Sequence, residues 1–299
     1  MKTFYLKNIA VLFLISGCFA ACDEESPEDR YFHCTMITDN SKVSLSFDTS
    51  GEYQNFVDID WGDGKKESVR IRTFSGGSIL HQYDADKATP HIITVEGPVE
   101  ELKCERNQLT SLNASGPLLV LDCSDNLLTS LDLGRLEKLE WLYCYDNQLT
   151  GIDVSRNIQL NMLQIYDNQL INLDLSKNTK LRTLSVGSNQ LTGLDVSRNI
   201  ELSSLGVSNN QLTTLDVSNN IELRSLGVRD NQLTGLDISR NIHLNNLDVS
   251  NNLMDAESLN NLFRMLPDRS NSTSNIYITG NPGYSTCDRS IARSKGWSP

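Results

Sequence analysis

A strict spacing of leucines is the dominant hydrophobic pattern in this chain. Leucines that lead a short apolar segment recur at a step of 21 residues, after a first step of 19. We number the copies one to eight by their lead leucines, which are Leu102, Leu121, Leu142, Leu163, Leu184, Leu205, Leu226 and Leu247. A small apolar residue follows two positions later and an asparagine five positions later, from Asn107 to Asn252. Alternating apolar side chains lie on one face of a strand, so each copy predicts a strand and a turn.

Each copy contains a second apolar pair. In several copies it is written Leu-Asp-Val-Ser, as at 194–197 and 215–218. We therefore expect an extended segment on both sides of each coil. A single coil cannot bury its own leucines, and only a stack of coils with a cap at each end encloses them. The repeated asparagine amide would satisfy backbone groups of neighbouring coils that would otherwise be buried without a partner.

The pattern changes after the eighth copy. Apolar residues within 255–266 have helical spacing, and Pro267 ends the predicted helix. The segment 276–278, followed by Asn281, restores the strand signature and predicts a ninth strand. We expect the tail 282–299 to close this end of the stack.

The repeat resembles the leucine-rich-repeat family, in the 21-residue bacterial form LxxLxVxxNxLTxLDVSxN. The resemblance covers about residues 102–255 in eight copies. It implies a mainly β, right-handed leucine-rich-repeat solenoid. It also implies a recognition role, because leucine-rich repeats mostly serve as binding surfaces.

Residues 31–98 have a different pattern. Alternating apolar positions predict half-buried strands; they include Val43, Leu45, Phe47, Val57, Ile59, Trp61, Val69 and Ile71. A tight turn, Asp-Trp-Gly-Asp-Gly at 60–64, is followed by His81-x-Tyr83 and by Ile-Thr-Val at 93–95. This set resembles a PKD-type immunoglobulin-like β-sandwich, although the region is short for a full sandwich. The resemblance implies a small β domain that caps the solenoid.

The N-terminus has the features of a targeting segment. Lys2 and Lys7 precede an apolar run at 9–15 that is too short to span a bilayer. Cys18 and Cys22 follow, and either resembles the lipobox cysteine of bacterial lipoproteins. An acidic segment directly after Cys22 resembles the signal that sends Bacteroidetes-type lipoproteins to the outer face of the outer membrane, so we favour Cys22. The alternative to lipidation is that the N-terminal segment is a simple secretory signal removed by a general signal peptidase.

The expected organisation has five parts. They are a lipoprotein signal peptide at 1–21, an acidic linker at 22–30, the β-sandwich at 31–98, the repeats at 99–255, and a helix, last strand and cap at 256–299.

The formal net charge is −12, from 26 basic and 38 acidic residues. This balance argues against a nucleic-acid partner. It would also repel anionic headgroups, so membrane attachment is expected through the lipid anchor only.

The outward positions of the repeats differ along the stack. Positions one, three and four after each lead leucine point outward. Aromatic residues gather there in copies three and four beside a row of aspartates, and Trp141 lies just before the third strand. The resulting set is Trp141, Tyr143, Tyr145, Tyr166, Asp125, Asp146 and Asp167. Exposed aromatic rings beside carboxylates suit a protein hot spot or a sugar ring. The alternative is that tyrosine simply suits a strand face and packs on its neighbours.

Other aspartates are interpreted as structural. One row repeats at the coil period and is formed by Asp132, Asp153, Asp174, Asp195, Asp216 and Asp237. We expect these side chains to accept hydrogen bonds of turns or neighbouring coils, because no coil supplies the ligands that a calcium row needs. Asp58, Asp60 and Asp63 fail the spacing of a calcium-binding loop, so a turn is predicted.

No catalytic, cofactor or metal site is predicted. Cys104, Cys123 and Cys144 fall in the inward column and are expected to act as small buried apolar residues. Nothing in the sequence pairs Cys34 or Cys287. The histidines are scattered and expected to lack partners; they are His33, His81, His91 and His243. Motifs of serine hydrolases, zinc proteases and phosphate-binding loops are absent from the sequence.

Three functions remain as hypotheses. The first is a surface lipoprotein whose repeat face binds a protein or glycan, in adhesion or nutrient capture. The second is a structural coat or spacer without a specific ligand. The third is a polymer hydrolase, which would need a unique carboxylate pair outside the repeat period, and the sequence shows none. The sequence leaves the oligomeric state open.

Overall fold

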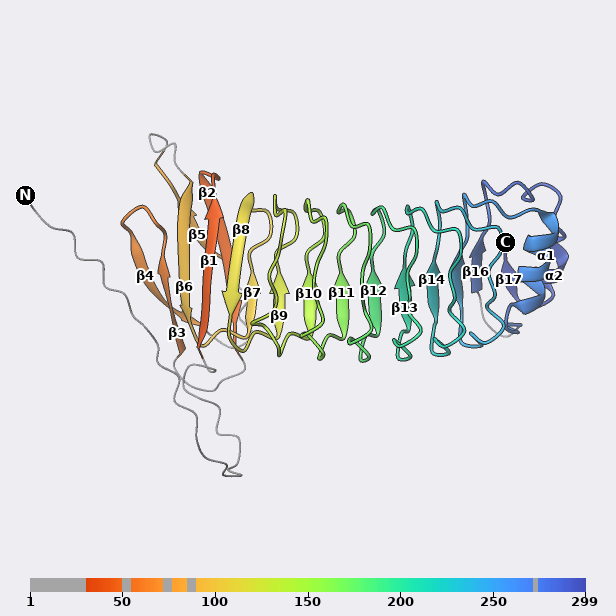
Figure 1. Cartoon of the computed structure of the whole chain (residues 1–299), viewed down its shortest axis with the longest axis horizontal. Coiled ribbons are helices and arrows are strands. Elements are labelled where there is room, and N and C mark those ends of the chain that lie inside the picture. Colours follow the sequence, from red (N-terminus) through yellow and green to blue (C-terminus); the bar gives the residue numbers. More distant parts are fainter. Residues whose placement is uncertain (1–30, 50–54, 72–76, 85–89, 271–273) are drawn as a thin grey trace, which may run out of the picture.

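The computed structural model describes residues 31–49, 55–71, 77–84, 90–270 and 274–299. The described chain forms an elongated stack of coils, with a group of longer strands at one end and two short helices at the other (Figure 1). The predicted signal peptide, with Cys18 and Cys22, lies outside the described residues.

One long sheet runs along the stack and takes one short strand from each coil. Its parallel strands are β7 (Glu101–Lys103), β9 (Val120–Asp122), β10 (Trp141–Tyr143), β11 (Met162–Gln164), β12 (Thr183–Ser185), β13 (Ser204–Gly206), β14 (Ser225–Gly227), β15 (Asn246–Asp248) and β16 (Ser274–Tyr277). The register aligns the lead leucines, so that Leu142 lies between Leu121 and Leu163. The predicted solenoid is confirmed, and β16 is the predicted ninth strand.

The lead leucines form the centre of a continuous core. All eight are at most 1% exposed, and they belong to one buried cluster that extends through every coil. Burying one leucine side chain contributes about 1.5–3 kcal/mol relative to leaving it in water. Since each leucine packs against coils above and below, the stack is stabilised by contacts between neighbouring coils.

The repeated asparagines have the predicted role. Asn168 is buried, and its Oδ1 accepts a hydrogen bond from the Leu149 amide of the preceding coil at 2.9 Å. Its Nδ2 donates to the carbonyl oxygen of Cys144 at 3.0 Å and to that of Ile165 at 3.3 Å. The same pattern recurs at Asn147, Asn189, Asn210 and Asn231 in neighbouring coils. Each side chain thus pairs backbone groups of two coils that water cannot reach.

On the second side of the coils the side chains alternate between buried and exposed positions as predicted, but the described coils form no regular ladder of strands there. Only the first coil forms a strand there, β8 (Leu109–Ser115), and its link to the next coil is a single bridge from Asn113 to Asp132. In later coils the Leu-Asp-Val segment leads directly into a turn. Asp153 Oδ1, for example, accepts a hydrogen bond from the Ser155 amide at 2.9 Å. Such a local bond closes the turn within its own coil.

These turns confirm the structural interpretation of the second aspartate row. The same bond forms at Asp132, Asp174, Asp195, Asp216 and Asp237. Hydrogen bonds from the Ser155 hydroxyl and amide lower the pKa of Asp153.

The N-terminal strands continue both sides of the first coil. They are β1 (Phe32–Thr38), β2 (Lys42–Asp48), β3 (Asn55–Asp60), β4 (Lys66–Ile71), β5 (Ile79–Gln82) and β6 (His91–Gly97). A five-stranded sheet has the order β4-β3-β6-β1-β8, while β2 and β5 extend the long sheet beyond β7. Antiparallel pairing of β2 with β7 sets Phe47 opposite Leu102. These pairings cover the open edge that the first coil would otherwise expose.

A buried aromatic network organises the Trp-Gly-Asp-Gly turn. The ring of His81 stacks on Trp61 at a centroid distance of 4.4 Å, and Tyr83 stacks on His91 at 3.5 Å. His81 Nε2 lies 3.1 Å from Asp63 Oδ2, and both side chains are 5% exposed. The expectation that the histidines lack partners was therefore wrong, because the turn and the later strand meet only in three dimensions.

The turn itself confirms the prediction made for these aspartates. The Gly62 amide donates to Asp60 Oδ1 at 3.0 Å, and the Lys65 amide donates to Asp63 Oδ1 at 3.0 Å. Gly62 has a φ of +78°, and a Cβ there would lie 2.4 Å from the carbonyl oxygen of Ile92. Only glycine fits this conformation and this close approach.

The C-terminal end is closed by helices and one short strand. Helix α1 (Ala256–Met265) begins at the N-cap Asp255 and ends before Pro267, as predicted. Helix α2 (Arg289–Arg293) follows, and β17 (Trp297–Ser298) pairs with β16. Among the described residues, neither helix has the length and apolar character needed to cross a bilayer.

Candidate functional site

The seven residues predicted to bind a partner lie on the exposed face of the long sheet, and we call them the aromatic–acidic patch. Trp141 begins β10 and is 42% exposed, while Tyr143 ends the same strand and is half-buried. Strands β9, β10 and β11 lie side by side in register (Figure 1). Residues of equal position in neighbouring coils therefore form columns across this face.

Two tyrosines in one column are in direct contact. The rings of Tyr145 and Tyr166 are stacked, with centroids 4.4 Å apart and nearly parallel planes at an angle of 6°. Both residues come just after their strands, at the third position behind the lead leucine. Parallel pairing at about 4.8 Å between strands brings their rings to stacking distance.

The three aspartates occupy a constrained backbone position. Asp125, Asp146 and Asp167 have φ values of 53°, 50° and 52°, in the left-handed region of the turn after each strand. Aspartate tolerates this region because its short polar side chain can bond locally. Burial raises the pKa of Asp146, and the neighbouring carboxylates of Asp167 and Asp125 raise it further. A column of mutually repelling carboxylates therefore borders the tyrosines.

One cation from the first coil partly offsets this charge. Arg106 Nε lies 3.2 Å from Asp125 Oδ2 at the end of the column. Coils five to eight carry small or polar residues in the same columns, such as Ser188, Asn209 and Gly206. In the ninth strand, Tyr277 again places an exposed ring in the column of Tyr143. The aromatic–acidic patch is thus confined to coils two to four.

The tyrosine stack predicts an unusual titration. Burial, together with the nearby Tyr145 and the carboxylates of Asp146 and Asp167, raises the pKa of Tyr166 to about 12. Because a raised pKa keeps the phenol neutral to higher pH, Tyr166 should ionise after ordinary tyrosines. We expect the ultraviolet titration of the protein minus that of Tyr166→Phe to show one midpoint near 12. A difference midpoint near 10, the ordinary value, would contradict the stacked geometry.

Sequence reasoning missed a hollow beside Trp141. It has a volume of about 160 Å³ and lies where the N-terminal strands meet the first coils; we call it the junction hollow. Its lining includes Asp48, Glu100, Glu101, Leu119, Val120, Glu140 and Trp141. One feature of the sequence could have indicated this hollow. The two residues before the lead leucine are apolar in the second coil, Leu119 and Val120, whereas the fifth coil has Arg182 and Thr183 at these positions. The position of Asp48 beside Glu101 follows only from the pairing of β2 with β7.

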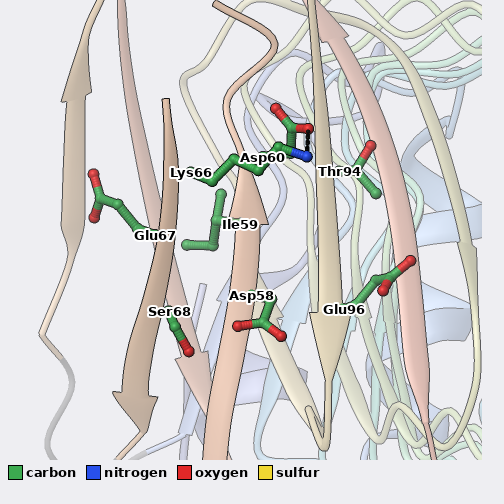
Figure 2. A pocket seen from close by; sticks show the side chains of 8 residues that line it. All are labelled: Asp58, Ile59, Asp60, Lys66, Glu67, Ser68, Thr94 and Glu96. Carbon is green, nitrogen blue, oxygen red and sulfur yellow. Dashed lines mark ion pairs between the residues drawn. The ribbon is translucent and has the colours of Figure 1, made fainter. Parts of the chain in front are cut away.

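A second hollow lies on the outer face of β3, β4 and β6, with a volume of about 610 Å³ (Figure 2). Figure 2 shows Asp60 and Lys66 reaching toward each other, and their side chains form an ion pair at 2.8 Å. The hydrogen bond from Lys66 lowers the pKa of Asp60. Glu67 accepts a hydrogen bond from Trp61 Nε1 at 3.2 Å. These contacts stabilise the sheet, and among the described lining residues Ile59 is the apolar one and none is aromatic.

The cysteines of the described chain are free thiols. Cys104, Cys123 and Cys144 are completely buried in the inward column, as predicted, and Cys34 is buried in β1. Burial raises the pKa of all four thiols. They therefore act as apolar packing groups and not as nucleophiles.

Comparison with known proteins supports the fold. No protein-family model and no curated protein sequence matches this chain. The functional domain of InlJ from Listeria monocytogenes, which includes a cysteine ladder, superposes with a TM-score of 0.56 at 30% identity, covering 65% of this chain and 47% of that one. A leucine-rich-repeat protein of Leptospira interrogans gives a TM-score of 0.52 at 24% identity, covering 61% of this chain and 49% of that one.

This chain spans about half the length of each of these two proteins. Their likeness agrees with the in-register strands, the leucine core and the asparagine ladder. The fold of the chain is therefore a mainly β leucine-rich-repeat solenoid.

Proposed function

We propose that this chain is a cell-surface lipoprotein that binds a protein partner through the aromatic–acidic patch, in adhesion or nutrient capture. The observation that carries the proposal is the cluster of four aromatic side chains on two adjacent coils, coils three and four, beside the aspartate column. Tyr277 of β16 also exposes a ring on this face, but it lies at the far end of the stack. Scaffold residues recur in every coil, whereas these rings do not. Tryptophan and tyrosine are also the residues that most often dominate the binding energy of protein interfaces.

A glycan partner is the second candidate, and the ring geometry makes it the weaker one. A sugar usually covers an open aromatic face. The faces of Tyr145 and Tyr166 cover each other at 4.4 Å, which leaves mainly their edges and hydroxyl groups to a ligand. Such edges suit the mixed apolar and polar contacts of a protein surface.

The anchoring part of the proposal rests on the N-terminal sequence. Acylation of Cys22, or of Cys18, would hold the chain at the outer membrane, facing outward. An acyl chain contributes about 0.8 kcal/mol for each methylene buried in lipid, so several chains on one cysteine anchor firmly. The acidic linker at 22–30 and the solenoid would then present the strand face to external partners.

The test compares partner capture by the full chain with capture by two variants. In the first variant Trp141, Tyr143, Tyr145 and Tyr166 are all replaced by serine. In the matched control Thr183, Ser185 and Arg229, on the same face of later coils, are replaced by alanine. Immobilised proteins are offered host surface proteins and a glycan array. We expect the parent and the control to retain protein ligands that the four-serine variant loses.

Two outcomes would count against the proposal. Equal capture by the parent and the four-serine variant would remove the patch from the binding site. Capture of no ligand by any of the three would favour the structural coat or spacer, for which the plain face of coils five to eight is suited. The hydrolase hypothesis has no support here, because the carboxylates of the patch recur at the coil period.

A further inference from the structure

The junction hollow lies on one row across four neighbouring strands. Asp48 of β2 is opposite Glu101 of β7, Glu101 is opposite Val120 of β9, and Val120 is opposite Trp141 of β10. This row passes from two carboxylates to an aliphatic side chain and an indole. Glu100 and Glu140 come from the segments that precede β7 and β10 and add two more carboxylates to the rim.

The floor and the rim of the hollow differ in chemistry. Leu119, Val120 and Trp141 supply apolar surface, and Trp141 remains 42% exposed. The four acidic residues also belong to the described lining, which contains no lysine or arginine. Lys103 lies nearby and pairs with Glu101 from the side. An apolar floor with an acidic rim is the complement of a side chain with an alkyl stem and a cationic head.

We propose that the junction hollow receives a lysine or arginine side chain of a basic segment of the protein partner. The alkyl stem would lie on Leu119 and Val120, and the cationic head would lie against the indole of Trp141 and the rim carboxylates. A cation is attracted to the face of a tryptophan ring, more strongly where water is excluded. The inference rests on the proposed function and names the chemistry of its partner.

The surroundings extend the same charge complementarity. Asp122, Asp125, Asp146 and Asp167 continue the acidic surface across the strand face from β9 to the turn behind β11. A segment with several basic residues could therefore follow the columns of coils one to four. The formal net charge of −12 would steer such a segment toward the protein and repel anionic ligands.

The test uses labelled peptides as probes. A fluorescein-labelled decapeptide of alternating arginine and serine is titrated with the purified full chain, and binding is followed by fluorescence anisotropy at low and physiological salt. A peptide with glutamate in place of arginine is the ligand control. We compare Glu101→Gln/Glu140→Gln with Glu201→Gln/Glu222→Gln, which removes equal charge from exposed positions away from the hollow.

We expect the arginine peptide to bind and the glutamate peptide not to bind. The Glu101/Glu140 variant should weaken binding about tenfold, as expected for two partly exposed charge pairs. The Glu201/Glu222 variant should bind like the parent, and both variants should unfold at the parent's temperature. Equal weakening by the two variants would mean general attraction to an acidic protein and would overturn the proposal. Absence of arginine-peptide binding by the parent would overturn it as well.

The two proposals fail in different ways. Glu101 and Glu140 are not among the four aromatic residues replaced in the capture experiment. If a captured partner is lost on the four-serine replacement but is unaffected by Glu101→Gln/Glu140→Gln, the patch binds a partner and the junction hollow does not receive its cation.

Discussion

Replacing Trp297 by alanine is expected to destabilise the protein by about 3–5 kcal/mol, the usual cost of removing a buried aromatic side chain. Trp297 is 2% exposed, and its Nε1 donates a hydrogen bond to the carbonyl oxygen of Pro267 at 2.8 Å. Its strand β17 pairs with β16 and covers the last coil. Removal of the ring would therefore leave a cavity and an unpaired carbonyl at the end of the stack, where a solenoid depends on its cap.

The measurement is urea unfolding followed by circular dichroism, with Trp141→Ala as the control. Both variants lose one indole, but Trp141 is 42% exposed and its removal should cost less than about 1 kcal/mol. Equal losses in the two variants would show that the tail beyond α2 contributes no special stability to the stack.

Replacing Asn168 by alanine should cost about 3 kcal/mol although it deletes only a small polar group. The change leaves the buried Leu149 amide without its acceptor and removes a donor from the carbonyl oxygens of Cys144 and Ile165. A buried backbone group without a partner costs about 1–3 kcal/mol, and water cannot replace the amide inside the stack.

The matched control is Asn172→Ala in the same coil. Asn172 is exposed, so its replacement should change the free energy of unfolding by no more than about 0.5 kcal/mol. Hydrogen exchange gives a second reading, since the Leu149 amide should exchange faster in Asn168→Ala. Unchanged stability and unchanged exchange would contradict the assigned role of the ladder.

Much of the solenoid could be derived from the sequence because its determinants are periodic. The 21-residue step of Leu142, Leu163 and Leu184 fixes which side chains meet, since each coil repeats the geometry of the last. Asn168 and its equivalents then follow as partners of buried backbone groups. The columns of the aromatic–acidic patch could be derived for the same reason, down to the neighbouring positions of Tyr145 and Tyr166.

The second side of the coils shows the limit of a pattern. Alternation in Leu-Asp-Val predicted which side chains are buried, and Ile152, Asp153 and Val154 follow it. The described coils nevertheless form no ladder on this side beyond the bridge from Asn113 to Asp132. Alternating apolar positions indicate which side chains are buried. They do not indicate whether a neighbouring backbone is close enough for the two segments to pair as β-strands.

The sequence by itself thus determined the repeat, the core and the columns of the strand face. Only the tertiary structure decided how the N-terminal strands join them: the β2–β7 pairing that places Asp48 in line with Trp141, and the contact of His81 with Asp63. The physical reason is that these contacts lie outside the repeat. They recur at no period, so their register depends on the packing of the whole end of the molecule.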